Sequence, residues 1–146
     1  RPMDAIQPYR LEMGTRMANS RGKSLYDFWG ARISDRLNAD LADHADTTVV
    51  NLASNEYFKA VDAKALGQTV IGAKFLNVKD GEPRSLMYYA KHARGSMVRW
   101  IMENRVDRAD GLKDFNAGGY TLDAIASTDN ELVFSRPQPP VKGSLS

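Results

Sequence analysis

Residues 68–90, QTVIGAKFLNVKDGEPRSLMYYA, constrain the fold more than any other stretch of this chain. Two extended runs rich in Val, Ile, Phe and Leu are separated by Lys79-Asp80-Gly81-Glu82. An Asp-Gly pair supplies the positive φ angles that a tight hairpin needs, and β-branched and aromatic residues favour the pleated backbone. We therefore predict two antiparallel strands joined at residues 79–82, and with them a sheet.

Two stretches have the apolar spacing of amphipathic helices. The first spans residues 24–42, where Ser24 can cap the free backbone N–H groups and Asp27 occupies the third helical position. Its apolar residues recur every three or four positions, at Leu25, Phe28, Trp29, Ile33, Leu37 and Leu41. The second helix is expected over residues 91–105, with Met97 and Trp100 on its apolar face.

The remaining segments complete a mixed pattern. TTVVNLAS (47–54) is expected as a buried strand followed by a short helix, and YTLDAIAS (120–127) and ELVFSR (131–136) as further strands. This order predicts a mixed α/β fold of the α+β class, in which a mixed sheet with a β-hairpin is flanked by two long amphipathic helices. The Pro/Gly/Ser-rich end, residues 137–146, has no apolar periodicity and is expected to be disordered.

Composition excludes several kinds of chemistry. The 146 residues include no cysteine, which rules out disulfides, thiolate metal sites and thiol-based peroxidase chemistry. The two histidines, His44 and His92, are not spaced with carboxylates as metal ligands, and no phosphate-binding glycine loop is present. We therefore expect no metal and no cofactor. No apolar run approaches the ~20 residues that span a bilayer, so we expect no contact with a membrane.

The net charge of +2 is distributed unevenly. Residues 37–62 carry one Lys or Arg and five acids, whereas residues 84–108 carry six Lys or Arg and two acids. Such a basic block can face a polyanion, or it can form a solvated surface of mixed charge, and charge alone favours the second. The cations in this block that are candidate anion contacts are Lys91, Arg94, Arg99 and Arg105.

Two short motifs place charged residues close together. In QPYRLEMG, Arg10 and Glu12 are two positions apart, so in an extended segment both point to one face and can pair or hold a ligand jointly. In KHARGSMVR, Lys91 and Arg94 fall in the expected first turn of a helix, where cations oppose the helix dipole unless an anion sits against that end. That anion can be a ligand, or a carboxylate of the protein itself.

A cluster of polar residues follows the first strand, in NLASNEYFK (51–59). In mixed and parallel sheets, ligands bind beyond the carboxyl ends of strands, where a strand leads into a helix. Ser54 can be a helix cap and Asn55 a turn residue, while Glu56 and Lys59 can both be solvated. The residue pattern therefore leaves open whether this cluster lines a site.

The same motifs resemble those of one protein family. QPYRLEMG, FWG, NLASNEYFK, KHARG, GGY and ELVFSR occur in the order found in the YaaA family, the bacterial peroxide stress resistance proteins. The resemblance covers residues 1–136, which we interpret as the C-terminal portion of a larger YaaA-like domain because family members are longer. It implies a cytoplasmic protein with a basic cleft, which binds DNA and helps to limit iron-dependent oxidative damage.

The positions of this chain that match the family motifs are candidate site residues. The matching positions are Arg10, Glu12, Asn51, Ser54, Glu56, Tyr57, Lys59, Lys91, Arg94 and Gly95, with Asn55 beside them in the predicted cleft. The resemblance implies that DNA is bound through its phosphates, without sequence specificity. The candidate contacts are Arg10, Lys59, Lys91, Arg94, Arg99 and Arg105. The alternative is an enzyme acting on a nucleotide or nucleobase, an anionic small molecule, with Glu56 as acid or base and Arg94 as anion holder.

Geometry distinguishes these two functions. A closed pocket that joins Arg10, Glu56 and Lys91 favours the enzyme, whereas an open basic groove favours DNA. The sequence predicts neither a substrate nor an oligomeric state.

Overall fold

The structure is a computed structural model that describes residues 5, 7 and 11–139. Its strands are β1 (Val49–Asn51), β2 (Val70–Lys79), β3 (Glu82–Arg84), β4 (Thr121–Leu122) and β5 (Glu131–Pro137). They form one sheet in the order β1-β2-β5-β4, and β3 also pairs with β2. β2 is parallel to β1 and β5, whereas β3 is antiparallel to β2, and β4 to β5. The predicted mixed sheet and α+β class are confirmed.

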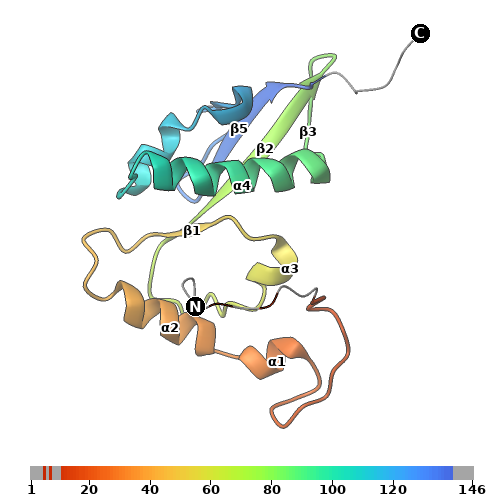
Figure 1. The fold of residues 1–146 in the computed structure, drawn as a ribbon, viewed down its shortest axis with the longest axis vertical. Coiled ribbons are helices and arrows are strands. Elements are labelled where there is room, and N and C mark those ends of the chain that lie inside the picture. Colours follow the sequence, from red (N-terminus) through yellow and green to blue (C-terminus); the bar gives the residue numbers. More distant parts are fainter. Residues whose placement is uncertain (1–4, 6, 8–10, 140–146) are drawn as a thin grey trace.

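The helices lie in two places relative to the sheet (Figure 1). They are α1 (Leu25–Trp29), α2 (Arg32–Leu41), α3 (Asn55–Phe58) and α4 (Met87–Glu103), followed by the 3₁₀ segments η1 (Ala109–Asp114) and η2 (Ala117–Gly119). α4 covers one face of β2 and β5, whereas α1, α2 and α3 lie together on the other side of β1 in this view. The molecule therefore has an upper part, built on the sheet and α4, and a lower part of short helices.

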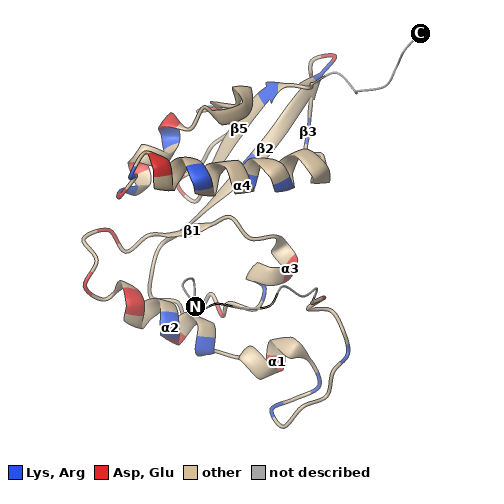
Figure 2. Ribbon diagram, in the orientation of Figure 1, with Lys and Arg blue, Asp and Glu red and all other residues tan. Residues whose placement is uncertain are grey.

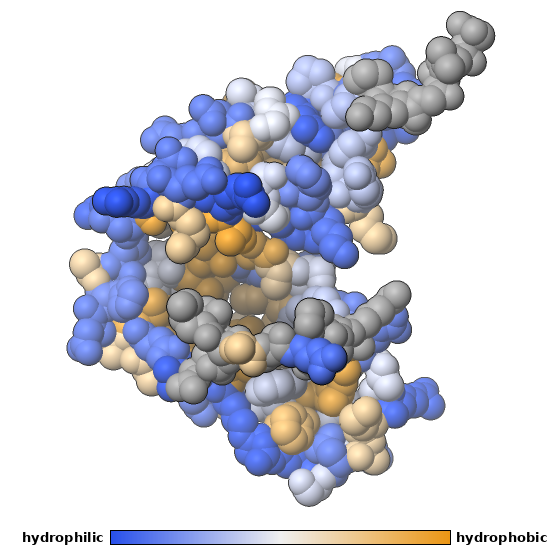
Figure 3. Space-filling model, viewed as in Figure 1, coloured by the Kyte–Doolittle hydropathy of each residue, from blue (hydrophilic) through white to orange (hydrophobic). Residues whose placement is uncertain are grey.

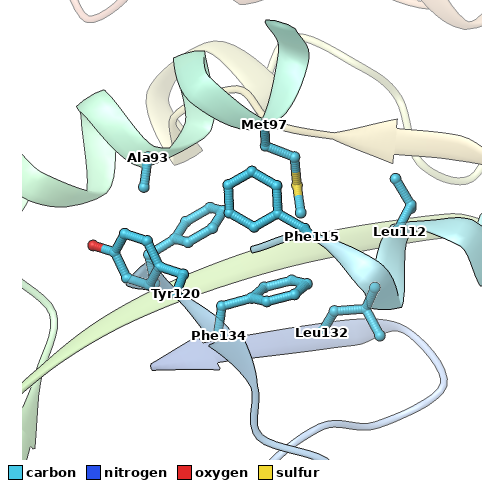
Figure 4. Close-up of a cluster of buried hydrophobic side chains, with 8 residues drawn as sticks. Ala93, Met97, Leu112, Phe115, Tyr120, Leu132 and Phe134 are labelled. Atoms are coloured by element: carbon cyan, nitrogen blue, oxygen red, sulfur yellow. The ribbon is translucent and has the colours of Figure 1, made fainter. Parts of the chain in front are cut away.

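The core lies between α4 and the sheet (Figure 4). Phe75 of β2 stacks on Phe134 of β5 with ring centroids 5.6 Å apart, and Phe115 meets both rings edge-on at 5.9 and 5.5 Å. Met97 of α4 is fully buried against this cluster. Stacked and edge-to-face pairs are the geometries that aromatic rings prefer, so this cluster fixes α4 on the sheet.

The hairpin forms where the sequence predicts it. Lys79 pairs with Glu82, and the two residues between them, Asp80 and Gly81, have φ angles of +54° and +79°. Positive φ at both central residues is what a two-residue turn of type I′ requires, and its twist matches that of antiparallel strands. β3 is short, and the chain then leaves the sheet to begin α4.

The helix predicted over residues 24–42 is instead two helices. Ser24 and Asp27 form the predicted capping box at the start of α1. However, Gly30 follows α1 with a φ of +48°, a left-handed conformation that a right-handed helix cannot contain, and α2 begins only at Arg32. The apolar spacing continues across this break, which is why it predicts one long helix.

The helix predicted over residues 91–105 begins four residues earlier, at Met87. Leu86 is its N-cap with an extended backbone, and no side chain caps the first turn, so the usual sequence signal for a helix start is missing. At the other end, α4 stops before Asn104, and Arg105 has a φ of +50°. This is the longest described helix, as the second predicted helix was expected to be long.

The strands near the end of the chain differ in length from those predicted. Of the strand expected at residues 120–127, only Thr121 and Leu122 form β4, and the Asp123 amide still donates to the Val133 carbonyl of β5. The Asp123 carboxylate then accepts hydrogen bonds from two following amides and turns the chain away. Pro137, where the disordered tail was expected to begin, is the last residue of β5. Residues 140–146 of that expected tail lie outside the described residues.

Asp46 ties the loop before β1 to the start of η1. Its carboxylate accepts hydrogen bonds from the Thr48 and Ala109 amides, each at 2.9 Å. The Thr48 side chain, followed by the Ala109 and Thr48 amides, lowers the pKa of Asp46 from 3.8 to about 2. The ionised form is therefore the one that joins these two segments.

We predict that the stability contributed by Asp46 is lost as the pH falls from about 4 to about 2. A carboxyl group whose pKa is lower in the folded than in the unfolded protein stabilises the fold above the unfolded pKa, and that stabilisation disappears as the folded form is protonated. Asp46→Asn should therefore have a lower urea midpoint than the parent protein at neutral pH, and the difference should shrink in acid. An equal difference at neutral pH and near the folded pKa would contradict this role.

Candidate functional site

A cleft separates α4 and β2 from α3 and the segment before α1 (Figure 3). It has a volume of about 1430 Å³ and is lined by residues from 12–15, 51–57, 72–75 and 85–94, together with Glu131. Figure 3 shows this hollow with apolar residues at its floor and hydrophilic residues around it. The cleft lies where β1 ends and the chain turns into α3.

Eight of the residues predicted from the sequence line this cleft. They are Glu12, Asn51, Ser54, Asn55, Glu56, Tyr57, Lys91 and Arg94. The parallel pairing of β1 with β2 brings these parts of the chain together, because Asn51 is aligned with Gly72 and the polar segment after β1 then lines the same cleft as the middle of β2.

Four other predicted residues lie elsewhere. Lys59 stacks over the ring of Tyr26, with Nζ 5.2 Å from the ring centroid, and both residues line a separate pocket of about 410 Å³. Gly95 and Arg99 are exposed on α4 and do not line the cleft. Arg105 follows the end of α4 and is also exposed.

The cleft meets only part of the geometric test for an enzyme. Glu56 and Lys91 both line this cleft, as the enzyme alternative requires. Figure 3 shows it open on one side rather than closed. Arg10 lies outside the described residues, so its predicted pairing with Glu12 is not placed, although Glu12 lines the cleft.

Glu56 and Tyr57 hold the segment before α1 against α3. The Met13 amide donates to Glu56 Oε1 at 2.8 Å, and the Tyr57 hydroxyl donates to the Leu11 carbonyl at 2.6 Å. Met13 itself is only 3% exposed. One oxygen of the Glu56 carboxylate therefore has a structural role, and the other accepts no hydrogen bond from a described residue.

The polar residues at the end of β1 also have separate roles. Asn51 Oδ1 accepts a hydrogen bond from the Ala53 amide at 3.1 Å, which fixes the turn from β1 towards α3. Ser54 is the N-cap of α3, but its side chain makes no capping hydrogen bond. Capping therefore explains the backbone position of Ser54 but gives no role to its hydroxyl group, and the residue lines the cleft.

The two sides of the cleft differ in charge. Lys91 and Arg94 belong to α4 and Lys74 to β2, whereas Glu12 and Glu56 belong to the opposite side. An acid, Glu131 of β5, also lines the cleft on the side of the sheet. Figure 2 shows basic positions along α4. In the part of the chain that the structure describes, none of the three cations forms an ion pair. Such cations are available to a phosphate or carboxylate group of a ligand.

The prediction that Lys91 and Arg94 lie in the first turn of a helix is wrong. Because α4 begins at Met87, Lys91 is its fifth residue and Arg94 its eighth. The helix dipole acts mainly within the first turn, so the predicted conflict between these cations and the dipole does not arise. Lys91 and Arg94 remain candidate site residues because they line the cleft and have no carboxylate partner among the described residues.

Sequence reasoning missed several residues that also line the cleft, namely Lys74, Ser85, Met87 and Glu131. Lys74 had a usable signal, because it interrupts the apolar run of β2. Glu131 had none, since it reaches the cleft through the pairing of β5 with β2, where it is aligned with Gly72. That register depends on residues far apart in the sequence.

Two further observations concern only residues 5, 7 and 11–139. Within them, no three His, Cys, Asp or Glu side chains are grouped so that they could hold a metal ion. In the same residues, no helix has both the length and the apolar character needed to cross a membrane.

Comparison with known proteins decides the family. The family model described as peroxide stress protein YaaA matches residues 1–126. The chain belongs to this family. The resemblance found in the sequence motifs is thereby confirmed.

Relatives of this YaaA family chain occur in several bacteria. It is 53% identical over 140 residues to a UPF0246 protein of Phenylobacterium zucineum, covering 96% of this chain and 53% of the relative. It is 53% identical over 143 residues to a UPF0246 protein of Maricaulis maris, with 98% and 54% covered, and 55% identical over 139 residues to one of Caulobacter vibrioides, with 95% and 54% covered. The chain thus spans about half the length of the curated relatives it matches.

We predict that Glu56→Ala loosens the segment before α1, whereas Glu56→Gln does not. Gln keeps an oxygen that can accept the hydrogen bond from the Met13 amide, and Ala leaves that amide without its acceptor. Leaving a buried donor unsatisfied costs about 1–3 kcal/mol, so the Met13 amide should exchange with solvent roughly tenfold faster or more in Glu56→Ala. Amide hydrogen exchange of the full-length variants measures this, and equal rates in the two variants would contradict the assignment.

Proposed function

We propose that this member of the peroxide stress family binds DNA without sequence specificity, using the cations of α4. The observation that carries the proposal is the state of Lys91, Arg94 and Arg99. All three come from one helix, and none has an ion-pair partner among the described residues. α4 contains one acid, Glu103, at its far end. Contacts from Lys and Arg to phosphates position a protein on DNA without reading its bases.

Membership of the peroxide stress family supports a proposal about where the protein acts and what damage it limits. We propose that the protein acts in the cytoplasm, where it binds DNA and limits iron-dependent oxidative damage. Because the chain spans about half the length of its relatives, the proposal concerns the full-length protein, to which this part contributes α4 and the cleft.

We predict that Arg94→Ala weakens DNA binding by the full-length protein about equally for unrelated sequences. Loss of one exposed phosphate contact should cost roughly 1 kcal/mol, about fivefold in Kd, and should make the slope of log K against log salt shallower by about 0.9. Fluorescence anisotropy with two unrelated duplexes over a range of salt concentrations measures both quantities.

The matched control is Arg36→Ala. It removes the same charge, but from α2, where Arg36 is paired with Asp40 at 2.6 Å. This variant should keep the parent affinity and salt slope. If Arg94→Ala behaves like Arg36→Ala, the assignment of α4 as the DNA contact surface is wrong.

One observation favours a second candidate function, an enzyme acting on a nucleotide or nucleobase. Glu56 and Lys91 line the same cleft, and Glu56 uses only one carboxylate oxygen to hold Met13. Glu56 would then transfer a proton to or from the substrate, while Arg94 would hold its phosphate.

Glu56→Gln separates the two candidate functions. Gln keeps the hydrogen bond to Met13 but cannot act as an acid or base, so an enzyme should lose its protection of cells against peroxide. A protein that only binds DNA should keep that protection, with unchanged or slightly higher DNA affinity because one negative charge near α4 is removed. Survival of peroxide-treated cells that express each full-length variant is the readout. Retained protection would contradict the enzyme.

A further inference from the structure

The two sides of β2 are paired to different extents. On one side, β5 pairs continuously with residues 72–78 of β2. On the other side, β1 pairs with residues 70–72 and β3 with residues 77–79. Among the described residues, no strand pairs with residues 73–76 on this second side. This interval borders the cleft, whose lining includes residues 72–75.

The backbone of Phe75 faces this interval. Successive residues of a strand direct their N–H and C=O groups to opposite sides. The Gly72 amide donates to a carbonyl just before β5, and the Val78 carbonyl accepts from an amide just after it, so even-numbered residues face β5. The Thr69 carbonyl accepts from β1, so odd-numbered residues, including Phe75, face the other side.

The backbone N–H and C=O groups of Phe75 need hydrogen-bond partners. Phe75 is only 1% exposed, and no described residue forms a hydrogen bond with its backbone on the cleft side. Buried N–H and C=O groups in folded proteins are paired in more than about 90% of cases, because an unpaired one loses its hydrogen bonds to water without replacement.

Size and exposed apolar surface identify the kind of partner. The cleft volume of about 1430 Å³ exceeds the roughly 300–1,000 Å³ of typical small-molecule sites. Met87, at the start of α4, lines the same cleft and is 87% exposed, so its side chain is apolar surface that a segment in the cleft can bury. The curated relatives contain almost as much chain again as this one spans.

We propose that an extended segment from the part of the full-length protein that this chain does not span pairs with β2 at Phe75. A single residue of an antiparallel segment can both donate to the Phe75 carbonyl and accept from its amide. Side chains of the segment on the α4 side would cover Met87 and fill the apolar floor of the cleft (Figure 3). Lys91 and Arg94 would then border the rim of a smaller cleft.

The experiment is a through-hydrogen-bond NMR measurement on the full-length, deuterated and ¹⁵N,¹³C-labelled protein. It correlates each amide nitrogen with the carbonyl carbon that accepts its hydrogen bond. We expect the Phe75 amide to correlate with a carbonyl outside the 146 residues of this chain. The Gly72 amide, whose acceptor in the structure is the Asn130 carbonyl, is the internal control and should correlate with the Asn130 carbonyl carbon.

Three results would overturn the proposal. The first is a correlation of the Phe75 amide with a carbonyl within these 146 residues. The second is no correlation, combined with rapid exchange of the Phe75 amide with water while the Gly72 control is observed. The third is an amide that becomes protected only when dAMP is added, which would assign the β2 edge to a nucleotide ligand instead of a protein segment.

Discussion

β2 is the strand on which the rest of the structure depends. β5 pairs along one of its sides, while β1 and β3 pair with its two ends on the other side. In a sheet, side chains stand above and below the plane, while backbone N–H and C=O groups point sideways within the plane, towards the neighbouring strands. Phe75 can therefore anchor the aromatic core under α4 and still direct its backbone groups to the cleft. The core and the candidate site are therefore built on the same few residues.

The polar cluster at the end of β1 is both a structural joint and a wall of the cleft. Asn51 fixes the turn after the strand, and Glu56 and Tyr57 hold the segment before α1 in place. The Ser54 hydroxyl is not used for capping, and one Glu56 oxygen is not used to hold Met13. This division leaves polar groups of the cleft lining on a hydrogen-bonded support, opposite the cations of α4.

The features that could be predicted from the sequence are those that depend on a few neighbouring residues. Asp80 and Gly81 predict their hairpin because the turn depends on the φ angles of those two residues alone. The start of α4 could not be placed, because Leu86 provides no capping side chain, and the break at Gly30 was hidden by an apolar spacing that continues through it. Glu131 could not be placed in the cleft at all, because its position depends on pairing between β2 and β5.

We propose that the α4 side of the cleft faces DNA, and lysine acetylation of the full-length protein with and without a DNA duplex tests this most directly. Lys91 should be acetylated more slowly when DNA is present, because the bound phosphates cover its ammonium group. Lys64, an exposed lysine in the lower part of the molecule, serves as the control and should react at the same rate in both samples. Protection of Lys64 with no change at Lys91 would contradict the account.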